Sequence, residues 1–163
     1  MKTYFQQLAS LHTGVRHSGT ERHFFRSIDH FLNEDSNNQA FYPAVVMDSI
    51  EGQITGDHAD DKIDMMRTGI LFIKKVSDVD SDQEIDEAHL SMKVLAFSFV
   101  ARMEADALAC RESNLKFLQE FNPLAVTYKY YGPVFDQCFG VLLAFSLGQI
   151  AEFDYDPNIW LTL

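Results

Sequence analysis

Three aspartates in an acidic run are the side chains that come nearest to a metal-binding pattern. Asp78, Asp80 and Asp82 have the spacing of the first ligands of an EF-hand calcium loop. That loop needs glycine at its sixth position and glutamate at its twelfth, where this chain has Gln83 and His89. We therefore interpret the run as an acidic helix entry and predict no metal ion and no other cofactor. A weak surface cation site on the three aspartates is the open alternative.

The histidines, serines and cysteines do not have the spacings of familiar catalytic or metal sites. The chain contains no HxH, HExxH or HxxxH, no GxSxG and no glycine-rich phosphate loop. Nucleophilic catalysis needs a nucleophile, a base and an orienting group, and no such set is visible. The sequence thus predicts no catalytic residues and a protein that is not an enzyme. Cys110 and Cys138 are expected to be buried, reduced thiols in a cytoplasm rather than a redox pair.

The charge balance argues against two classes of partner. Lys and Arg number 13 and Asp and Glu 24, which gives a net charge of −11. Such a chain repels phosphate backbones and anionic lipid, so we expect neither sequence-specific nucleic-acid binding nor a membrane partner. The longest apolar stretch, 141–147, is far shorter than the roughly 20 residues that cross a bilayer. The first residues lack the apolar run of a signal peptide, so a soluble protein is expected.

Hydrophobic periodicity predicts that residues 1–40 form a helical N-terminal segment. Tyr4, Phe5, Leu8 and Leu11 recur at helical spacing before Gly14 interrupts them. A second helix is expected over 20–32 with Thr20 as its N-cap, and the polar run 33–38 is expected to be a loop. The apolar face of that second helix comprises Phe24, Phe25, Ile28, Phe31 and Leu32.

Two strands and a long helix are expected next. The continuous apolar run 41–47 predicts a strand buried on both faces, 51–62 a turn or bent strand end, and 63–76 an alternating strand. Gly69 is a candidate for a bulge or a close backbone approach. The helix is expected over 82–111, capped by Ser81 or Asp82, with Glu84 completing a capping box.

The long helix carries apolar side chains on two sides. One stripe contains Ile85, Ala88, Met92, Leu95, Phe99 and Met103, and the other contains Leu90, Val94, Phe97 and Ala101. A helix that is apolar on more than one side is covered on more than one side. One cover is the sheet. The other is either the N-terminal helix or a neighbouring subunit.

The remaining chain predicts a strand pair and an apolar tail. Residues 124–131 and 139–147 alternate and read as an antiparallel hairpin, and 151–163 is an apolar tail that packs on its own domain or on a partner. The sequence therefore predicts a single α+β domain over 1–163. Its antiparallel or mixed sheet of four to five strands has one long helix packed across it, plus N-terminal helices.

The order of these elements resembles that of tail-terminator and tail-completion (neck) proteins of tailed bacteriophages. The segments that carry the resemblance are FYPAVVM (41–47), TGILFI (68–73), the helix over 85–103 and FGVLLAF (139–145). The resemblance implies a ring, commonly hexameric, that caps the tail tube and joins it to the head. Its partners would be copies of itself and other tail or neck proteins, in a virion assembled in the host cytoplasm.

Two functions follow as hypotheses. The first is a structural, ring-forming virion protein that acts in tail completion or head–tail joining. The alternative is a cytoplasmic bacterial α+β domain that binds a small ligand or a partner protein. Aromatic residues are enriched at protein interfaces, and the positions that we expect at an interface are Phe97, Tyr131, Phe153, Tyr155 and Trp160.

Overall fold

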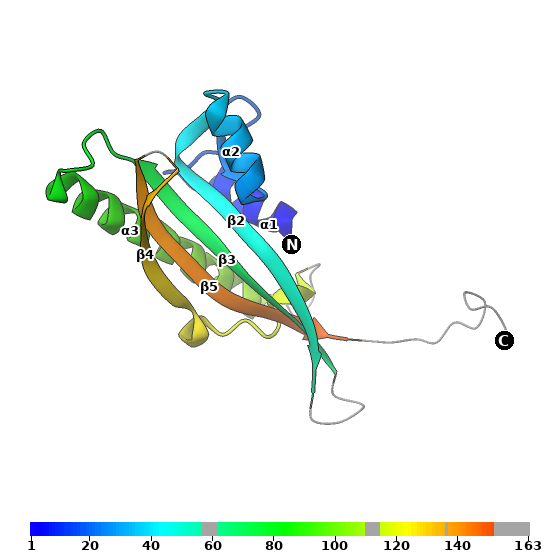
Figure 1. The fold of residues 1–163 in the computed structure, drawn as a ribbon. Coiled ribbons are helices and arrows are strands. Elements are labelled where there is room, and N and C mark those ends of the chain that lie inside the picture. The colour runs from blue at the N-terminus through cyan, green and yellow to red at the C-terminus, as the bar shows by residue number, and fades with distance from the viewer. Residues whose placement is uncertain (57–61, 110–114, 136, 152–163) are drawn as a thin grey trace, which may run out of the picture.

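A five-stranded mixed sheet organises the chain in the computed structural model, which describes residues 1–56, 62–109, 115–135 and 137–151 (Figure 1). The strand order is β1-β2-β3-β5-β4, with β1 parallel to β2 and all other neighbours antiparallel. This confirms the predicted α+β class. The strands are β1 (Arg22–Phe25), β2 (Ala40–Thr55), β3 (Ile63–Lys75), β4 (Thr127–Val134) and β5 (Cys138–Ile150). The helices are α1 (Lys2–Leu11), α2 (Ile28–Ser36), α3 (Asp82–Ala109) and two short 3-10 turns, η2 (Lys116–Leu118) and η3 (Pro123–Ala125).

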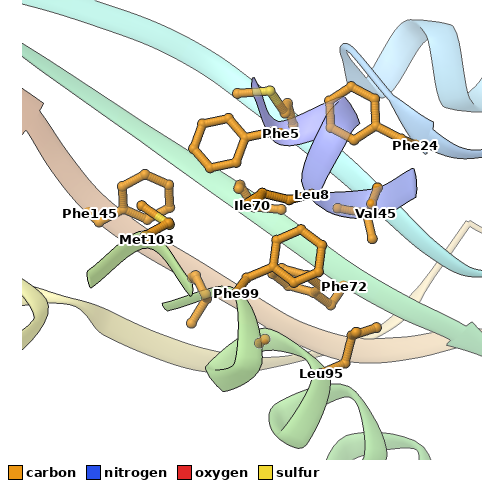
Figure 2. Packing of buried hydrophobic residues seen from close by; sticks show 14 of the residues in the cluster. Phe5, Leu8, Phe24, Val45, Ile70, Phe72, Leu95, Phe99, Met103 and Phe145 are labelled. Carbon is orange, nitrogen blue, oxygen red and sulfur yellow. The ribbon is translucent and has the colours of Figure 1, made fainter. Parts of the chain in front are cut away.

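Helices cover both faces of the sheet. The long helix α3 lies across one face with α1 beside it, and α2 packs on part of the opposite face (Figure 1). Figure 2 shows the larger core, where Phe5 and Leu8 of α1 meet Phe99 and Met103 of α3 above the strands. The buried stripe of α3 is the one predicted from the sequence, with Ala88, Met92, Leu95, Phe99 and Met103 all in the interior.

The burial on both faces predicted for the run 41–47 is confirmed for its second half, whereas Phe41 at its start is 42% exposed. Ala44, Val45, Val46 and Met47 have no exposed surface. Val45 and Met47 belong to the core under α1 and α3, whereas Ala44 and Val46 belong to the core under α2. Successive side chains of a strand point to opposite faces, so a run without polar residues requires a cover on each side.

A β-bulge in β2 adjusts the alternation next to Gly69. Asp48 and Ser49 stand together opposite Gly69, between the pairs Met47–Ile70 and Ile50–Thr68. The extra residue lets Ile50 pack against the same core as Met47. Gly69 itself pairs regularly with Ala144 of β5. The expected bulge therefore lies in β2, opposite Gly69, and not at Gly69 itself. Its close approach is confirmed, because a Cβ there would lie 3.1 Å from the Leu143 carbonyl oxygen.

The predicted helix over 20–32 is correct only from Ile28, and the helical N-terminal segment predicted over 1–40 contains a strand. Residues Arg22–Phe25 form the edge strand β1. Phe24 enters the core under α1 while Phe25 enters the core under α2, and only a strand sends neighbouring side chains to opposite faces. The N-cap is Ser27, whose Oγ accepts from the His30 N–H, rather than Thr20. The helix then continues to Ser36 through most of the expected loop 33–38.

The entry to α3 combines a predicted cap with an unpredicted one. Ser81 Oγ accepts from the Glu84 N–H at 3.3 Å, as expected. The Glu84 carboxylate does not complete the capping box; it accepts from the backbone N–H and hydroxyl of Ser77 and from the Asp78 N–H. These hydrogen bonds lower the pKa of Glu84. They tie the end of β3 to the start of the helix.

Two other boundaries differ from the sequence prediction. Residues 51–55, from the stretch 51–62 that was expected to be a turn or bent strand end, continue β2 against β3, and residues 57–61 lie outside the described residues. The strand β4 begins at Thr127 rather than at 124, because Leu124 and Ala125 form η3. Asn122 caps this turn by accepting from the Leu124 N–H at 2.9 Å. The β4–β5 hairpin is confirmed. No helix in the described part of the chain is long and apolar enough to cross a membrane.

At Gly140 the backbones of β5 and β3 approach too closely for a side chain. A Cβ at this position would lie 1.8 Å from the Phe72 carbonyl oxygen. We predict that Gly140→Ala lowers the free energy of unfolding by about 3 kcal/mol, the upper range for overpacking. Gly19→Ala is the control, since nothing lies within 4 Å of its Cβ position. Urea denaturation of both variants measures the difference, and equal stabilities would contradict the predicted clash.

Candidate interaction surface

The second apolar stripe of α3 lies in solvent. Leu90, Val94 and Phe97 are 63%, 65% and 43% exposed, whereas Phe99 on the buried stripe is 2% exposed. The helix α1 packs beside α3 in the core through Phe5 and Leu8, and it leaves this stripe uncovered. We expected either the N-terminal helix or a neighbouring subunit to cover this stripe. The N-terminal helix does not cover it.

Strand β4 extends the exposed stripe into a continuous surface. Tyr128 and Tyr130 point to the α3 side of the sheet, and they are 45% and 46% exposed. The Phe97 and Tyr128 rings stand edge to face with centroids 5.4 Å apart, and Tyr128 and Tyr130 are 6.0 Å apart. We call this surface the aromatic face. It consists of Leu90, Lys93, Val94, Phe97, Tyr128 and Tyr130.

Lys93 contacts both Phe97 of α3 and Tyr128 of β4 within the aromatic face. Lys93 Nζ lies 4.8 Å from the Tyr128 ring centroid and 5.4 Å from that of Phe97, and it donates to the Tyr128 hydroxyl at 3.1 Å. The hydrogen bond to Tyr128 raises the pKa of Lys93, so the amine remains charged. A cation over two rings restrains them without covering them. The rings therefore remain available to a partner.

The aromatic face borders an edge of the sheet with which no further described strand pairs. β4 pairs with β5 and is the last strand in the sheet order. An edge strand exposes backbone N–H and C=O groups that can pair with another chain, and lysine and proline on an edge oppose such pairing. β4 carries both, as Lys129 and Pro133. Side chains of the aromatic face rather than a long strand addition are thus the more suitable contact.

The residues predicted at an interface do not form one surface. Phe97 is in the aromatic face, whereas Tyr131 points to the opposite side of the sheet and packs half-buried against the core under α2. Phe153, Tyr155 and Trp160 and the tail 152–163 lie outside the described residues. Sequence reasoning missed Tyr128 and Tyr130 as contact residues. Their alternation placed them on one face of a strand, but nothing local indicated that α3 lies alongside.

The contact between Ser98 and His12 resembles a catalytic pair in distance alone. Ser98 Oγ lies 2.9 Å from His12 Nε2 beside a cavity of about 180 Å³ between α1 and α3. His12 Nδ1 accepts from the Gly14 N–H at 3.0 Å, which places the ring proton on Nε2. The Ser98 hydroxyl donates to the Leu95 carbonyl. The imidazole therefore donates to the serine and cannot act as its base in this arrangement.

The side chains of Asp78, Asp80 and Asp82 do not surround a common metal position. Asp78 Oδ1 accepts from the Asp80 N–H at 3.0 Å in a local turn, and Asp82 begins α3. Within the described ranges, no three His, Cys, Asp or Glu side chains are arranged to hold a metal ion. Cys138 is buried and contacts the Tyr42 hydroxyl at 3.3 Å, and Cys110 is outside the described residues.

Four histidines lie around β1 or between α1 and α3. His12 contacts Ser98 of α3, whereas His17, His23 and His30 lie beside or within β1 and at the start of α2. His89 stacks near Tyr130 with a centroid distance of 4.9 Å, and His58 lies outside the described residues. His17 and His30 line a second, polar cavity of about 590 Å³, together with Arg22 and Arg26.

Comparison with known proteins identifies no relative. No protein-family model, curated protein or solved structure matches the chain. The aromatic face and the polar cavity are therefore interpreted from their own chemistry.

Burial of His12 makes stability depend on pH. Burial lowers the pKa of His12 below 6.5, so the unfolded chain binds the proton more tightly and the folded state loses stability as the pH falls below about 6.5. We predict that His12→Asn, which keeps an acceptor near the Nδ1 position, reduces this loss between pH 7.5 and pH 5. Urea denaturation across this range measures it.

Ser98→Ala is the matched control for the pH series. It removes the hydrogen-bond partner of His12 but retains the titrating ring, so stability should decrease while the slope with pH remains. A slope unchanged in His12→Asn would contradict burial of this ring as its source.

Proposed function

We propose that the chain is a structural subunit that assembles with copies of itself into a ring. The proposed place is the tail or neck of a phage or phage-like particle, in tail completion or head–tail joining. The observation that carries the proposal is the aromatic face, which leaves Leu90, Val94 and Phe97 in solvent beside the unpaired edge of β4. We also propose that the protein is not an enzyme and resides in the virion after assembly in the host cytoplasm.

A ring requires two different surfaces on each subunit, which meet head to tail. The aromatic face is one candidate. The other is a small apolar hollow of about 80 Å³ on the opposite side of the sheet, between α2 and the β4–β5 hairpin. Its lining includes Ile28, Leu71, Tyr131, Phe135 and Leu142. Phe97 and Tyr131, which were both predicted at an interface, thus occupy the two opposite surfaces that a head-to-tail contact needs.

The order of elements supports the phage-tail part of the proposal. Between Ala40 and Ile150 the chain has a strand pair, one long helix across the sheet and a second strand pair. This is the order on which the resemblance to tail-terminator and tail-completion proteins rests. Because many α+β domains share such an order, the aromatic face carries the assembly proposal and the order suggests only its setting.

The acidic surface predicts how such an assembly responds to salt. Subunits with a net charge of −11 repel one another, whereas contacts of leucine, valine and phenylalanine do not depend on charge. Added salt should therefore strengthen the assembly. An assembly held by ion pairs would respond in the opposite way.

A second candidate function is a cytoplasmic domain that binds a small ligand. The polar cavity beside β1 favours it, since a cavity of about 590 Å³ lies in the usual size range of ligand sites. The two candidates use different parts of the molecule.

Native mass spectrometry with negative-stain imaging tests the assembly. We predict a closed oligomer whose population rises with protein and salt concentration. Replacing Val94 and Phe97 together by glutamate should weaken association by roughly thirtyfold or more, because each charge would be buried against an apolar partner.

Leu108→Glu is the matched control on the same helix. Leu108 is 79% exposed and lies outside the aromatic face, so this variant should assemble like the unaltered chain. Circular dichroism checks that each variant is folded. A chain that remains monomeric at every concentration, or equal assembly of the double variant and the control, would contradict the proposal.

A further inference from the structure

The cavity beside β1 is basic although the chain is acidic. It lies between α1, the loop 17–19, β1 and the start of α2. Two guanidinium groups and two imidazoles line it, from Arg22, Arg26, His17 and His30, and none of its lining residues is aspartate or glutamate. In a protein with a net charge of −11, such a gathering points to an anion.

One carboxylate stands behind the cavity and neutralises only part of this charge. Glu34 of α2 pairs with Arg22 Nη1, and its other oxygen is 3.8 Å from His30 Nε2. Arg26 has no ion pair within the described residues. Its Nη2 donates at 3.2 Å to the neutral side-chain oxygen of Gln6. The Arg26 charge is therefore available to a ligand.

The hydrogen bonds around His17 define its protonation. His17 Nδ1 accepts from the backbone N–H groups of His23 and Phe24, each at 3.1 Å. An imidazole nitrogen that accepts carries no proton, so the neutral ring bears its proton on Nε2. Burial, followed by the nearby charges of His23, Arg22 and His30, lowers the pKa of His17, which agrees with a neutral ring.

The side chains of Gln6, His17 and Arg26 consequently offer more donors to one another than acceptors. His17 Nε2–H faces the side-chain amide of Gln6, with 3.3 Å between the two nitrogens, and Arg26 donates to the oxygen of that amide. If the amide is turned over, its oxygen accepts from His17 but its NH₂ group then faces Arg26. In both orientations one acceptor serves two donors, and a donor remains without a partner within this group.

We infer that this cavity binds the phosphate group of a phosphorylated small molecule. A phosphate supplies several acceptor oxygens and the negative charge that Arg26 lacks, and charged hydrogen bonds of this kind are the strong ones. Inorganic phosphate alone is much smaller than a cavity of about 590 Å³. Phe24 also lines the cavity, with 3% of its surface exposed.

This inference is independent of the proposed ring. None of the residues that line the cavity belongs to the aromatic face or to the hollow around Tyr131. Binding can therefore be measured in the monomer or the assembly, and failure of one proposal leaves the other in place.

Isothermal titration calorimetry with adenosine monophosphate, adenosine and inorganic phosphate tests the inference. We expect adenosine monophosphate to bind, adenosine not to bind, and the affinity to fall as salt is added. Equal affinities for adenosine monophosphate and inorganic phosphate would contradict a role for the organic part and would make free phosphate the ligand. The absence of heat with both phosphate compounds would overturn the inference.

Arg26→Gln is the decisive variant, because Arg26 forms no ion pair with any described residue whose loss would disturb the fold. We expect its affinity for adenosine monophosphate to fall roughly tenfold or more. Arg67→Gln removes the same charge from β3, outside the cavity, and should bind like the unaltered chain. Equal losses in the two variants would overturn the inference, since they would indicate attraction to overall charge. Thermal denaturation confirms that both variants are folded.

Discussion

The burial of β2 and β3 on both faces is the constraint on which the structure depends. The run Ala44–Met47 has no exposed surface, and Ile70–Ile73 is buried opposite it. Apolar side chains on both sides of a strand require a layer on each side. Helices α1 and α3 provide one layer and α2 provides the other (Figure 1). Since α3 turns one stripe of side chains to the sheet, its second stripe, with Leu90, Val94 and Phe97, is left in solvent.

The two candidate binding surfaces lie at the two edges of the sheet, beside β4 and beside β1. The aromatic face has one charged residue, Lys93, which lies over the rings of Phe97 and Tyr128. The basic cavity lies at the opposite edge of the sheet, beside β1, where Arg26 has an amide rather than a carboxylate as its partner. One edge of the sheet is thus suited to a protein surface and the other to an anion. The long helix and the central strands hold the two apart.

Local periodicity predicted the parts of the fold that a short stretch of chain determines. The strands predicted over 63–76 and 139–147 and the buried stripe of α3 are confirmed. Burial along β3 does not alternate, because residues 68–73 are covered on both faces of the sheet. The strand β1 was not predictable, since Phe24 and Phe25 fit a helix face as well as a strand whose two sides are both covered. The aromatic face joins residues some thirty positions apart, and the basic cavity joins four segments. Only the strand order, which places β4 and β1 at the edges, brings these residues together.

The central claim is that the aromatic face is buried between subunits. Hydroxyl-radical footprinting with mass spectrometry, on dilute and on concentrated protein, tests it most directly. We predict that oxidation of Phe97, Tyr128 and Tyr130 falls as the protein assembles. Oxidation of Leu11 and Leu108, which are exposed elsewhere on the helices, should stay constant. An assembled particle in which the aromatic face is oxidised as readily as in the monomer would contradict the account.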